Sequence, residues 1–189
     1  MARVYMIRHG RPAAGWGDHG ADPDPGLDDV GRAQAEAASR ALLALPTPPT
    51  LVLTSPLRRC RETAAPFAAA LGMQPVIEPR VAEIPTPKAL AAADRPEWLR
   101  TAFAGTWAGI EGDLDYLAWR DAVAAAVIAH PGAAIFSHFV AINAVMSVIT
   151  GDDRVIGFRP DHTSMTILAV RDGALSLVAR GDEAVTGVL

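Results

Sequence analysis

One stretch decides how this chain folds: Val4-Tyr5-Met6-Ile7-Arg8-His9-Gly10. Its first four residues are apolar and include β-branched and aromatic side chains, a composition typical of a buried β-strand. The strand then ends in a cation, an imidazole and a glycine, so two reactive side chains stand where the chain leaves the sheet. Gly10 has no Cβ, and we therefore expect the chain to turn sharply there and a ligand to approach its backbone closely.

Strands and helices alternate along the rest of the chain. Short apolar runs predict further strands at 51–54, 75–78, 133–137, 165–170 and 175–179. Helical patterns and their caps predict helices at about 28–45, 55–72, 115–130 and 139–150. We expect Asp28 to cap the first of these helices, Ser55 to cap the second with Pro56 at its first position, and Pro66 to kink or split it.

This alternation predicts an α/β fold, namely a three-layer α/β/α sandwich around a mainly parallel central sheet. The last two predicted strands are joined by Asp172-Gly173, a dipeptide typical of tight hairpins. The hairpin adds an antiparallel edge strand to the sheet.

Length and composition narrow the classes of function. The 189 residues suffice for one domain, which we expect to span 1–189 with an inserted flap at about 85–113, where prolines and glycines weaken the pattern. A net charge of −4 argues against nucleic acid as a partner.

The single cysteine, Cys60, excludes an internal disulfide, and we expect it in the core. The apolar runs are too short for a signal peptide or a membrane span, which predicts a cytoplasmic protein with no membrane partner.

Polar side chains follow four of the predicted strands. In an open α/β sheet, ligands bind beyond the carboxyl ends of the strands. The side chains expected at this rim are those of Arg8 and His9 after the first strand, Ser55 with Arg58 and Arg59 after the second, Glu83 after the third, and His138 after the fourth. Two histidines, at least two arginines and a carboxylate at one rim indicate an anion site with acid–base chemistry attached.

Phosphoryl transfer is the chemistry that these residue types suggest. Guanidinium groups bind phosphate oxygens through paired hydrogen bonds and stay charged at any working pH. A neutral imidazole can attack phosphorus, and a second, protonated imidazole can stabilise the charge that develops. A carboxylic acid can protonate the leaving oxygen and then activate water as a base. Such a site needs no metal, because arginine and histidinium supply the positive charge.

Five sequence blocks in register resemble the histidine phosphatase (phosphoglycerate mutase-like) superfamily. Arg8-His9-Gly10 resembles the Arg-His-Gly signature of that family, a tripeptide that is weak evidence alone. The other blocks are Leu27 with Gly31, Gln34 and Ala35; Ser55-Pro56-Leu57 with Arg59, Cys60, Thr63 and Ala64; Glu83-Ile84; and Ser137-His138. Together they span nearly the whole chain.

The resemblance implies a role for each matched residue. His9 would be the phosphorylated nucleophile and Glu83 the proton donor. Arg8, Arg59 and His138 would form the phosphate pocket. The resemblance implies a phosphoric monoester hydrolase of the histidine acid type, which acts on a small phosphorylated substrate and uses no cofactor.

The chain departs from the family pattern at three places. Arg11-Pro12 stands where the family commonly has an acidic residue followed by threonine or serine, and Gly15 stands where asparagine is common. A phosphate ligand is then missing or replaced, and Arg11 is a candidate for the replacement. Phe139 follows His138 where glycine is usual, which would crowd or reshape that wall.

Several residues keep alternative interpretations. Glu78 and Glu111 compete with Glu83 for the role of the acid. His138 could cap a helix, although we favour a functional role. His162, ahead of the fifth strand, is either a further phosphate-binding candidate or a plain turn residue.

The aromatic residues of the flap also allow two interpretations. Trp98 and Trp107 could belong to a lid that selects substrates, but hydrophobic cover for the helices is the more economical interpretation.

Three functions are compatible with the sequence. The first is a metal-independent phosphatase that hydrolyses a small phosphomonoester through a phosphohistidine. The second is a cofactor-dependent phosphoglycerate mutase, which the short chain and the composition of the loop after Gly10 make less favourable. The third is a non-catalytic module that binds phosphate or phosphoprotein. The flap and the loop at 11–26 would set the natural substrate.

Overall fold

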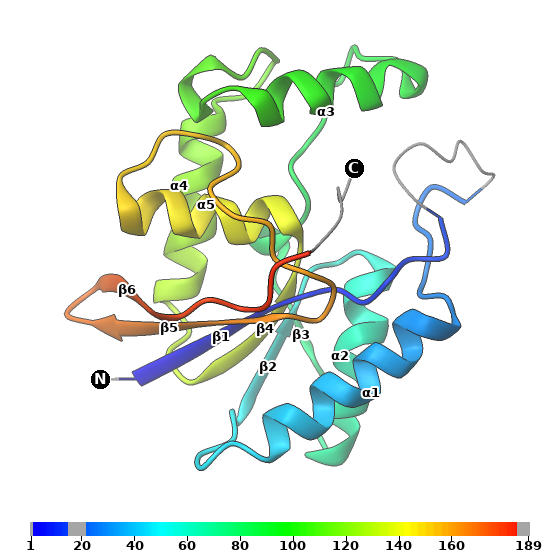
Figure 1. The fold of residues 1–189 in the computed structure, drawn as a ribbon, viewed down its shortest axis with the longest axis vertical. Coiled ribbons are helices and arrows are strands. Elements are labelled where there is room, and N and C mark those ends of the chain that lie inside the picture. The colour runs from blue at the N-terminus through cyan, green and yellow to red at the C-terminus, as the bar shows by residue number, and fades with distance from the viewer. Residues whose placement is uncertain (1, 15–21, 185–189) are drawn as a thin grey trace.

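The computed structural model describes residues 2–14 and 22–184 and contains one six-stranded sheet with helices on both faces (Figure 1). The strand order is β3-β2-β4-β1-β5-β6. The strands are β1 (Ala2–Arg8), β2 (Leu51–Thr54), β3 (Val76–Ile77), β4 (Ala133–Ser137), β5 (Met165–Arg171) and β6 (Ala174–Ala179). The first four strands are parallel, whereas β5 pairs antiparallel with both β1 and β6. The predicted α/β/α sandwich with an antiparallel edge is confirmed.

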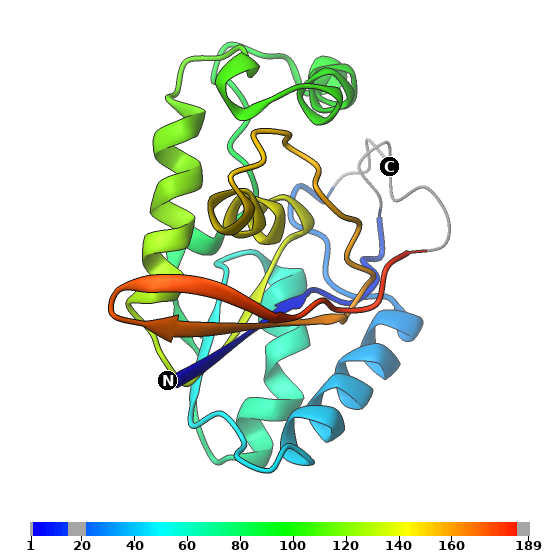
Figure 2. The same cartoon turned by 60° about the vertical axis from the view of Figure 1, so that its left-hand side comes forward.

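Helices cover the two faces of this sheet in pairs. The α-helices are α1 (Asp29–Leu43), α2 (Arg58–Ala70), α3 (Arg95–Ala104), α4 (Tyr116–Ile128) and α5 (Phe139–Thr150). Figure 2 shows α1 and α2 below the sheet and α4 and α5 above it. In the residues that the structure describes, no helix is both long and apolar enough to cross a membrane.

The opening strand holds the two layers together because its side chains alternate between them. Val4 and Met6 are fully buried in the cluster beneath α4 and α5, and Tyr5 and Ile7 are buried in the cluster beneath α1 and α2. A strand that is covered on both faces reads as a continuous apolar run, as this one does. Truncation of Ile7 to alanine would cost about 2–5 kcal/mol.

The first helix begins as the sequence predicts. The Asp28 carboxylate accepts a hydrogen bond of 2.7 Å from the backbone N–H of Gly31, which satisfies one of the free donors at the helix start. The end of α5 also follows the prediction, since Gly151 takes a left-handed φ of +71° there.

The start of the second helix was wrongly predicted. The N–H of Ser55 still donates to the carbonyl of Phe136, at 3.0 Å, so the backbone remains part of the sheet at this point. The N-cap of α2 is Leu57, two residues later, and no side chain caps it. Pro66 does not break α2, because the buried Ala64 and Phe67 pack that helix against the sheet on either side of the proline.

Residues 85–113 connect the region after β3 to α4. They contain α3 and the short 3-10 helices η2 (Ala92–Asp94) and η3 (Trp107–Gly109), and a third, η1 (Pro79–Val81), precedes them. Figure 1 shows α3 at the top of the molecule, beyond α5. Trp107 is 1 % exposed and lies 5.9 Å from Trp119, ring to ring, and Trp98 packs against the same core. Trp98 and Trp107 thus serve as hydrophobic cover for the helices.

Candidate active site

The polar residues predicted to converge meet at one edge of the sheet. Parallel pairing places Arg8 level with Ser137, so the next residues, His9 and His138, leave the sheet side by side with ring centroids 5.3 Å apart. Arg59 arrives from α2 and Glu83 from the segment after η1. All are buried, with exposed fractions of 0–8 %: Arg8, His9, Arg59, Glu83 and His138.

His9 is held as a neutral imidazole with a defined proton position. Its Nδ1 lies 2.8 Å from the carbonyl oxygen of Gly10, which can only accept, so Nδ1 donates and Nε2 carries the lone pair. Burial, aided by the charges of Arg59 and Arg8, lowers the pKa of His9 well below its usual value. The ring therefore has an unprotonated Nε2 at neutral pH, the form that a nucleophile needs.

The structure adds a second reason for a glycine at position 10, beside the turn and the close ligand approach that the sequence suggested. A Cβ at Gly10 would lie 2.7 Å from the carbonyl oxygen of Gly31, and a Cβ at Gly31 would overlap the carbonyl oxygen of Arg11. The start of α1 therefore packs directly on the backbone after β1. The N–H of Gly10 donates to the Thr63 hydroxyl at 2.9 Å, which ties the same backbone to α2.

Arg8 is fixed from two sides. Its Nη1 donates to the carbonyl of Pro160 at 2.9 Å, and its guanidinium lies 5.2 Å from the ring centroid of Phe139. Burial lowers the pKa of Arg8 to about 10, so the group remains charged at neutral pH. Phe139, the departure from the family pattern, thus forms the wall on which this cation rests.

His138 links Arg59 to Ser55. The Arg59 Nη2 lies 3.2 Å from Nδ1 of His138, and the Ser55 hydroxyl lies 2.8 Å from its Nε2. Guanidinium can only donate, so Nδ1 accepts and Nε2–H donates to Ser55. Burial and the charge of Arg59 lower the pKa of His138 well below its usual value. Although His138 occupies the N-cap position of α5, its side chain makes no capping bond there.

Cys60 lies in the core as predicted, and it also touches this histidine. Its thiol donates to the carbonyl of Ser137, and its Sγ lies 3.3 Å from the His138 Nε2. Burial raises the pKa of Cys60, which keeps the thiol protonated and unreactive.

Glu83 is the carboxyl group that the structure brings to the site. Its Oε1 accepts from the N–H of Ile84 at 3.1 Å, and its Oε2 lies 3.5 Å from the His138 Nδ1 and 3.7 Å from the Arg59 Nη2. Burial raises the pKa of Glu83 above its usual value, although the charge of Arg59 opposes the shift. A raised pKa favours the protonated form that a general acid needs.

The two rival acids are placed differently. Glu78 binds Arg80 at 2.6 Å, and that hydrogen bond lowers the pKa of Glu78 to about 2, so this carboxylate is ionised at working pH. Glu111 is exposed, and its carbonyl accepts from the Trp98 indole. Neither has the environment of a proton donor.

His162 comes to the site because β5 runs antiparallel, which returns the residues before it to the rim. Its ring lies 5.8 Å from that of His9, and burial lowers its pKa to about 4. Arg11, by contrast, pairs with Asp28 at 2.5 Å, and its side chain is half exposed. Gly15 lies outside the described residues.

Ser55 was expected both at this rim and as a helix cap. Its hydroxyl accepts from the His138 Nε2–H at 2.8 Å and from the backbone N–H of Leu57 at 3.2 Å, although it is not the N-cap of α2. Arg95, at the start of α3, was passed over in the sequence analysis, although its charge lowers the pKa of Glu83 and that of His138.

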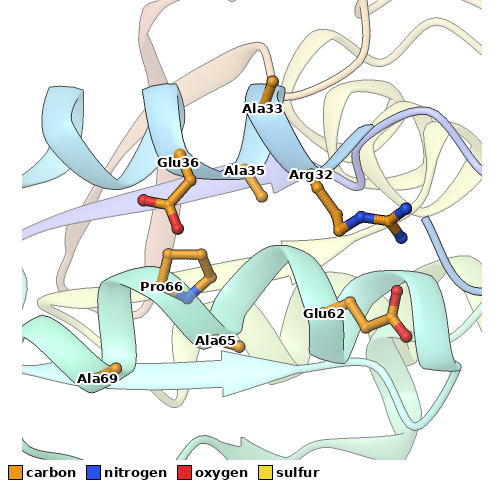
Figure 3. Close-up of a pocket in the computed structure, with 8 residues that line it drawn as sticks. All are labelled: Arg32, Ala33, Ala35, Glu36, Glu62, Ala65, Pro66 and Ala69. Carbon is orange, nitrogen blue, oxygen red and sulfur yellow. The ribbon is translucent and has the colours of Figure 1, made fainter. Parts of the chain in front are cut away.

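A separate groove lies between α1 and α2. It has a volume of about 590 Å³, and Figure 3 shows Glu36 of α1 opposite Pro66 of α2 across it. Its lining consists of Arg32, Ala33, Ala35, Glu36, Glu62, Ala65, Pro66 and Ala69. None of the converging rim residues lines this groove.

Comparison with solved structures shows the same fold in phosphatases. A phosphoserine phosphatase from Entamoeba histolytica matches with a TM-score of 0.76 at 18 % identity, over 96 % of this chain and 98 % of that one. A putative alpha-ribazole-5'-P phosphatase from Escherichia coli has a TM-score of 0.74 at 17 % identity, over 98 % of each chain. A mycobacterial glucosyl-3-phosphoglycerate phosphatase has a TM-score of 0.72 at 20 % identity, over 97 % of this chain and 100 % of that one.

Comparison of the sequence with known proteins and family models identifies the family. None of the curated proteins matches the chain at a significant level. The family model for the histidine phosphatase superfamily (branch 1), however, matches residues 4–183, which include every converging rim residue. The chain belongs to the histidine phosphatase superfamily.

Proposed function

We propose that this protein is a metal-independent phosphatase that hydrolyses a small phosphomonoester through a phosphohistidine on His9. The observation that carries the proposal is the state of His9, which is buried, neutral, and fixed by Gly10 with its proton on Nδ1. Without that hydrogen bond the ring could present either nitrogen. With it, Nε2 is the nucleophilic atom.

The first half of the reaction transfers the phosphoryl group to the enzyme. The His9 Nε2 forms a bond to phosphorus while the bond from phosphorus to the substrate's alcohol oxygen breaks. Glu83, whose pKa burial raises in the direction of the protonated form, gives its proton to that oxygen. The alcohol then leaves and Glu83 remains as a carboxylate.

The second half returns the enzyme to its starting state. The Glu83 carboxylate takes a proton from water as the water oxygen attacks phosphorus, and the phosphorus–Nε2 bond breaks. The products are inorganic phosphate, neutral His9 and protonated Glu83. One carboxyl group thus serves as acid and then as base.

Arg8, Arg59 and His138 would bind the transferring phosphoryl group. The two guanidinium groups supply two positive charges against a phosphate dianion. The free site depresses the pKa of His138 because burial and Arg59 disfavour its cation. A bound dianion would reverse that balance and favour protonation, which adds charge where the transition state needs it.

The solved relatives support the substrate class. Their names describe phosphatases of phosphoserine, glucosyl-3-phosphoglycerate and an alpha-ribazole phosphate. For this chain we propose the shared feature only, a phosphate ester of a small alcohol.

The test is phosphate release from a panel of phosphomonoesters by the wild type, His9→Ala and His130→Ala. His130 is a matched control because its ring bonds to the carbonyl of Ala126 near the end of α4. We expect the wild type and His130→Ala to release phosphate and His9→Ala to release none. Phosphate binding without release by the wild type would favour the binding-module alternative, and interconversion of 2- and 3-phosphoglycerate would favour the mutase.

A further inference from the structure

His162 gives the rim a third imidazole, for which the proposed reaction has no role. In the sheet, β1 lies between β4 and β5. His138, directly after β4, and His162, shortly before the antiparallel β5, therefore approach His9 from its two neighbouring strands. Their ring centroids lie 5.3 Å and 5.8 Å from that of His9. The nucleophile thus has one histidine on the β4 side and another on the β5 side.

The ring of His162 lacks the hydrogen bonds that hold the ring of His138. Both ring nitrogens of His138 lie within hydrogen-bond distance of a side chain, that of Arg59 or that of Ser55. In the part of the chain that the structure describes, the ring of His162 makes no hydrogen bond. The Asp161 Oδ1 lies 3.9 Å from its Nδ1, beyond hydrogen-bond distance, and already accepts from the His162 backbone N–H at 2.7 Å. The His162 side chain is nevertheless only 20 % exposed, and a polar group buried without a partner calls for an explanation, of which a ligand is one.

The backbone around His162 is held tightly against the site. The N–H of Thr163 donates to the carbonyl of Arg8 at 3.0 Å, and the N–H of Arg8 donates to the carbonyl of Ser164 at 3.3 Å. The Arg8 side chain adds its bond to Pro160, at 2.9 Å. Thr163 has a φ of +58°, a left-handed conformation that is strained for a β-branched residue. Such strain persists only where the surrounding structure enforces it, and it is concentrated at functional sites.

We propose that His162 binds the transferring phosphoryl group from the β5 side of His9, by donating a ring N–H to one of its oxygens. A neutral imidazole always has one N–H donor, and phosphate oxygens are strong acceptors. In the proposed pocket Arg8 and Arg59 supply the positive charge, and His162 adds a directed hydrogen bond on the more open side. The His138 side chain is fully buried, whereas that of His162 is partly accessible. This inference rests on the proposed function, which places the phosphoryl group on His9.

The test is the binding of inorganic phosphate, measured by isothermal titration calorimetry, to the wild type and to variants of His162. In His162→Gln the amide nitrogen takes the place of Nε2, and in His162→Asn it takes the place of Nδ1. His162→Leu has a similar size and no donor, and His162→Phe is a second variant without a donor. The matched control is His130→Leu, because the His130 ring bonds to the carbonyl of Ala126 in α4. Thermal unfolding shows that each variant is folded.

The variants without a donor should raise the Kd for phosphate about 10- to 100-fold, as expected for a lost hydrogen bond to a charged group. At least one of the two amide variants should bind phosphate within about 3-fold of the wild type, and that variant identifies the donating nitrogen. All four His162 substitutions change the packing beside Arg8, but only glutamine and asparagine keep an N–H. Their retained affinity therefore separates a donated hydrogen bond from a role in packing. His130→Leu should bind phosphate as the wild type does.

Three results would overturn the assignment: no measurable phosphate binding by the wild type, binding within about 3-fold of the wild type in the variants without a donor, or an equal loss in all His162 variants. The last result would mean that His162 acts only by packing. Hydrolysis of p-nitrophenyl phosphate by the wild type, with loss in His9→Ala, reports on the proposed function separately. Hydrolysis together with an unchanged Kd in His162→Leu would overturn only this inference. The expected pattern of Kd values without hydrolysis would overturn the phosphatase and support His162 as a phosphate ligand.

Discussion

Replacement of Glu83 by glutamine tests whether this carboxyl group transfers the proton in the reaction. Glutamine has nearly the same shape and keeps an oxygen for the N–H of Ile84, so the change removes the proton-carrying function and leaves the packing in place. Burial already favours the neutral form of Glu83, so a neutral amide is compatible with this site. The stability of the variant should therefore stay close to that of the wild type.

The expected loss depends on the leaving group. With an alkyl phosphate, the departing alkoxide needs a proton, and loss of the general acid should lower kcat about 10²- to 10⁴-fold. With p-nitrophenyl phosphate, the departing phenolate needs no proton, so the phosphorylation step should survive. Hydrolysis of the phosphohistidine still needs the base. The variant should therefore show a burst of about one p-nitrophenol per active site, followed by slow turnover.

The assay is rapid-quench measurement of p-nitrophenol and steady-state release of phosphate from glycerol 3-phosphate, with Glu78→Gln as control. Glu78 was a rival candidate for the acid, but its carboxylate pairs with Arg80, so Glu78→Gln should keep full activity. The pH dependence of the activity gives an independent test of this role. Activity on alkyl phosphates requires protonated Glu83, so it should fall as pH rises through the raised pKa, and Glu83→Gln should lack that limb. Alkyl phosphate hydrolysis within about 3-fold of wild type would refute the role of Glu83.

Three further perturbations test the surroundings of the site. Phe139→Leu removes the ring beneath the Arg8 guanidinium and should raise KM for phosphomonoesters about 3- to 30-fold with a smaller change in kcat; an unchanged KM in steady-state assays would contradict this. Gly31→Ala places a methyl group against the Arg11 carbonyl and should lower the free energy of unfolding by about 1–3 kcal/mol in urea titrations; wild-type stability would show that the contact relaxes freely. The folded state lowers the pKa of His162 to about 4, so protonation of the unfolded chain should weaken the fold as pH falls from 7 to 4.5. His162→Asn should reduce that loss by about 2–3 kcal/mol, and parallel stability curves for the two proteins would refute the assignment.

The sequence allowed the rim to be predicted because parallel strands obey a simple rule. Every strand that runs in the direction of β1 delivers its next residues to the same edge, so His9 and His138 could be brought together from 129 positions apart without coordinates. The helix cap at Asp28 could also be predicted, because capping joins residues only three positions apart in the sequence. These predictions rest on interactions within a few residues or on sheet direction.

The wrongly predicted helix start and the contacts that the sequence analysis missed share a different cause. Ser55 has the sequence of a helix cap, but its N–H still bonds to β4, and only the tertiary sheet pairing decides that its hydroxyl serves His138. The glycine at position 10 is needed by Gly31, a partner on α1 that no local pattern indicates. Arg95 went unnoticed because its electrostatic influence on Glu83 and His138 acts between segments that are far apart in the sequence. Packing between distant segments set all three.

The identity of the phosphorylated atom decides whether His9 is the nucleophile. The protein is mixed with p-nitrophenyl phosphate and denatured in alkali, which preserves phosphohistidine, and the modified residue and nitrogen are identified by mass spectrometry and phosphorus NMR. Because Nδ1 of His9 donates to the Gly10 carbonyl, we expect phosphate on Nε2 of His9 and none in His9→Ala. Phosphate on His138, His162 or the Nδ1 of His9, or phosphate release with no phosphohistidine at all, would contradict it.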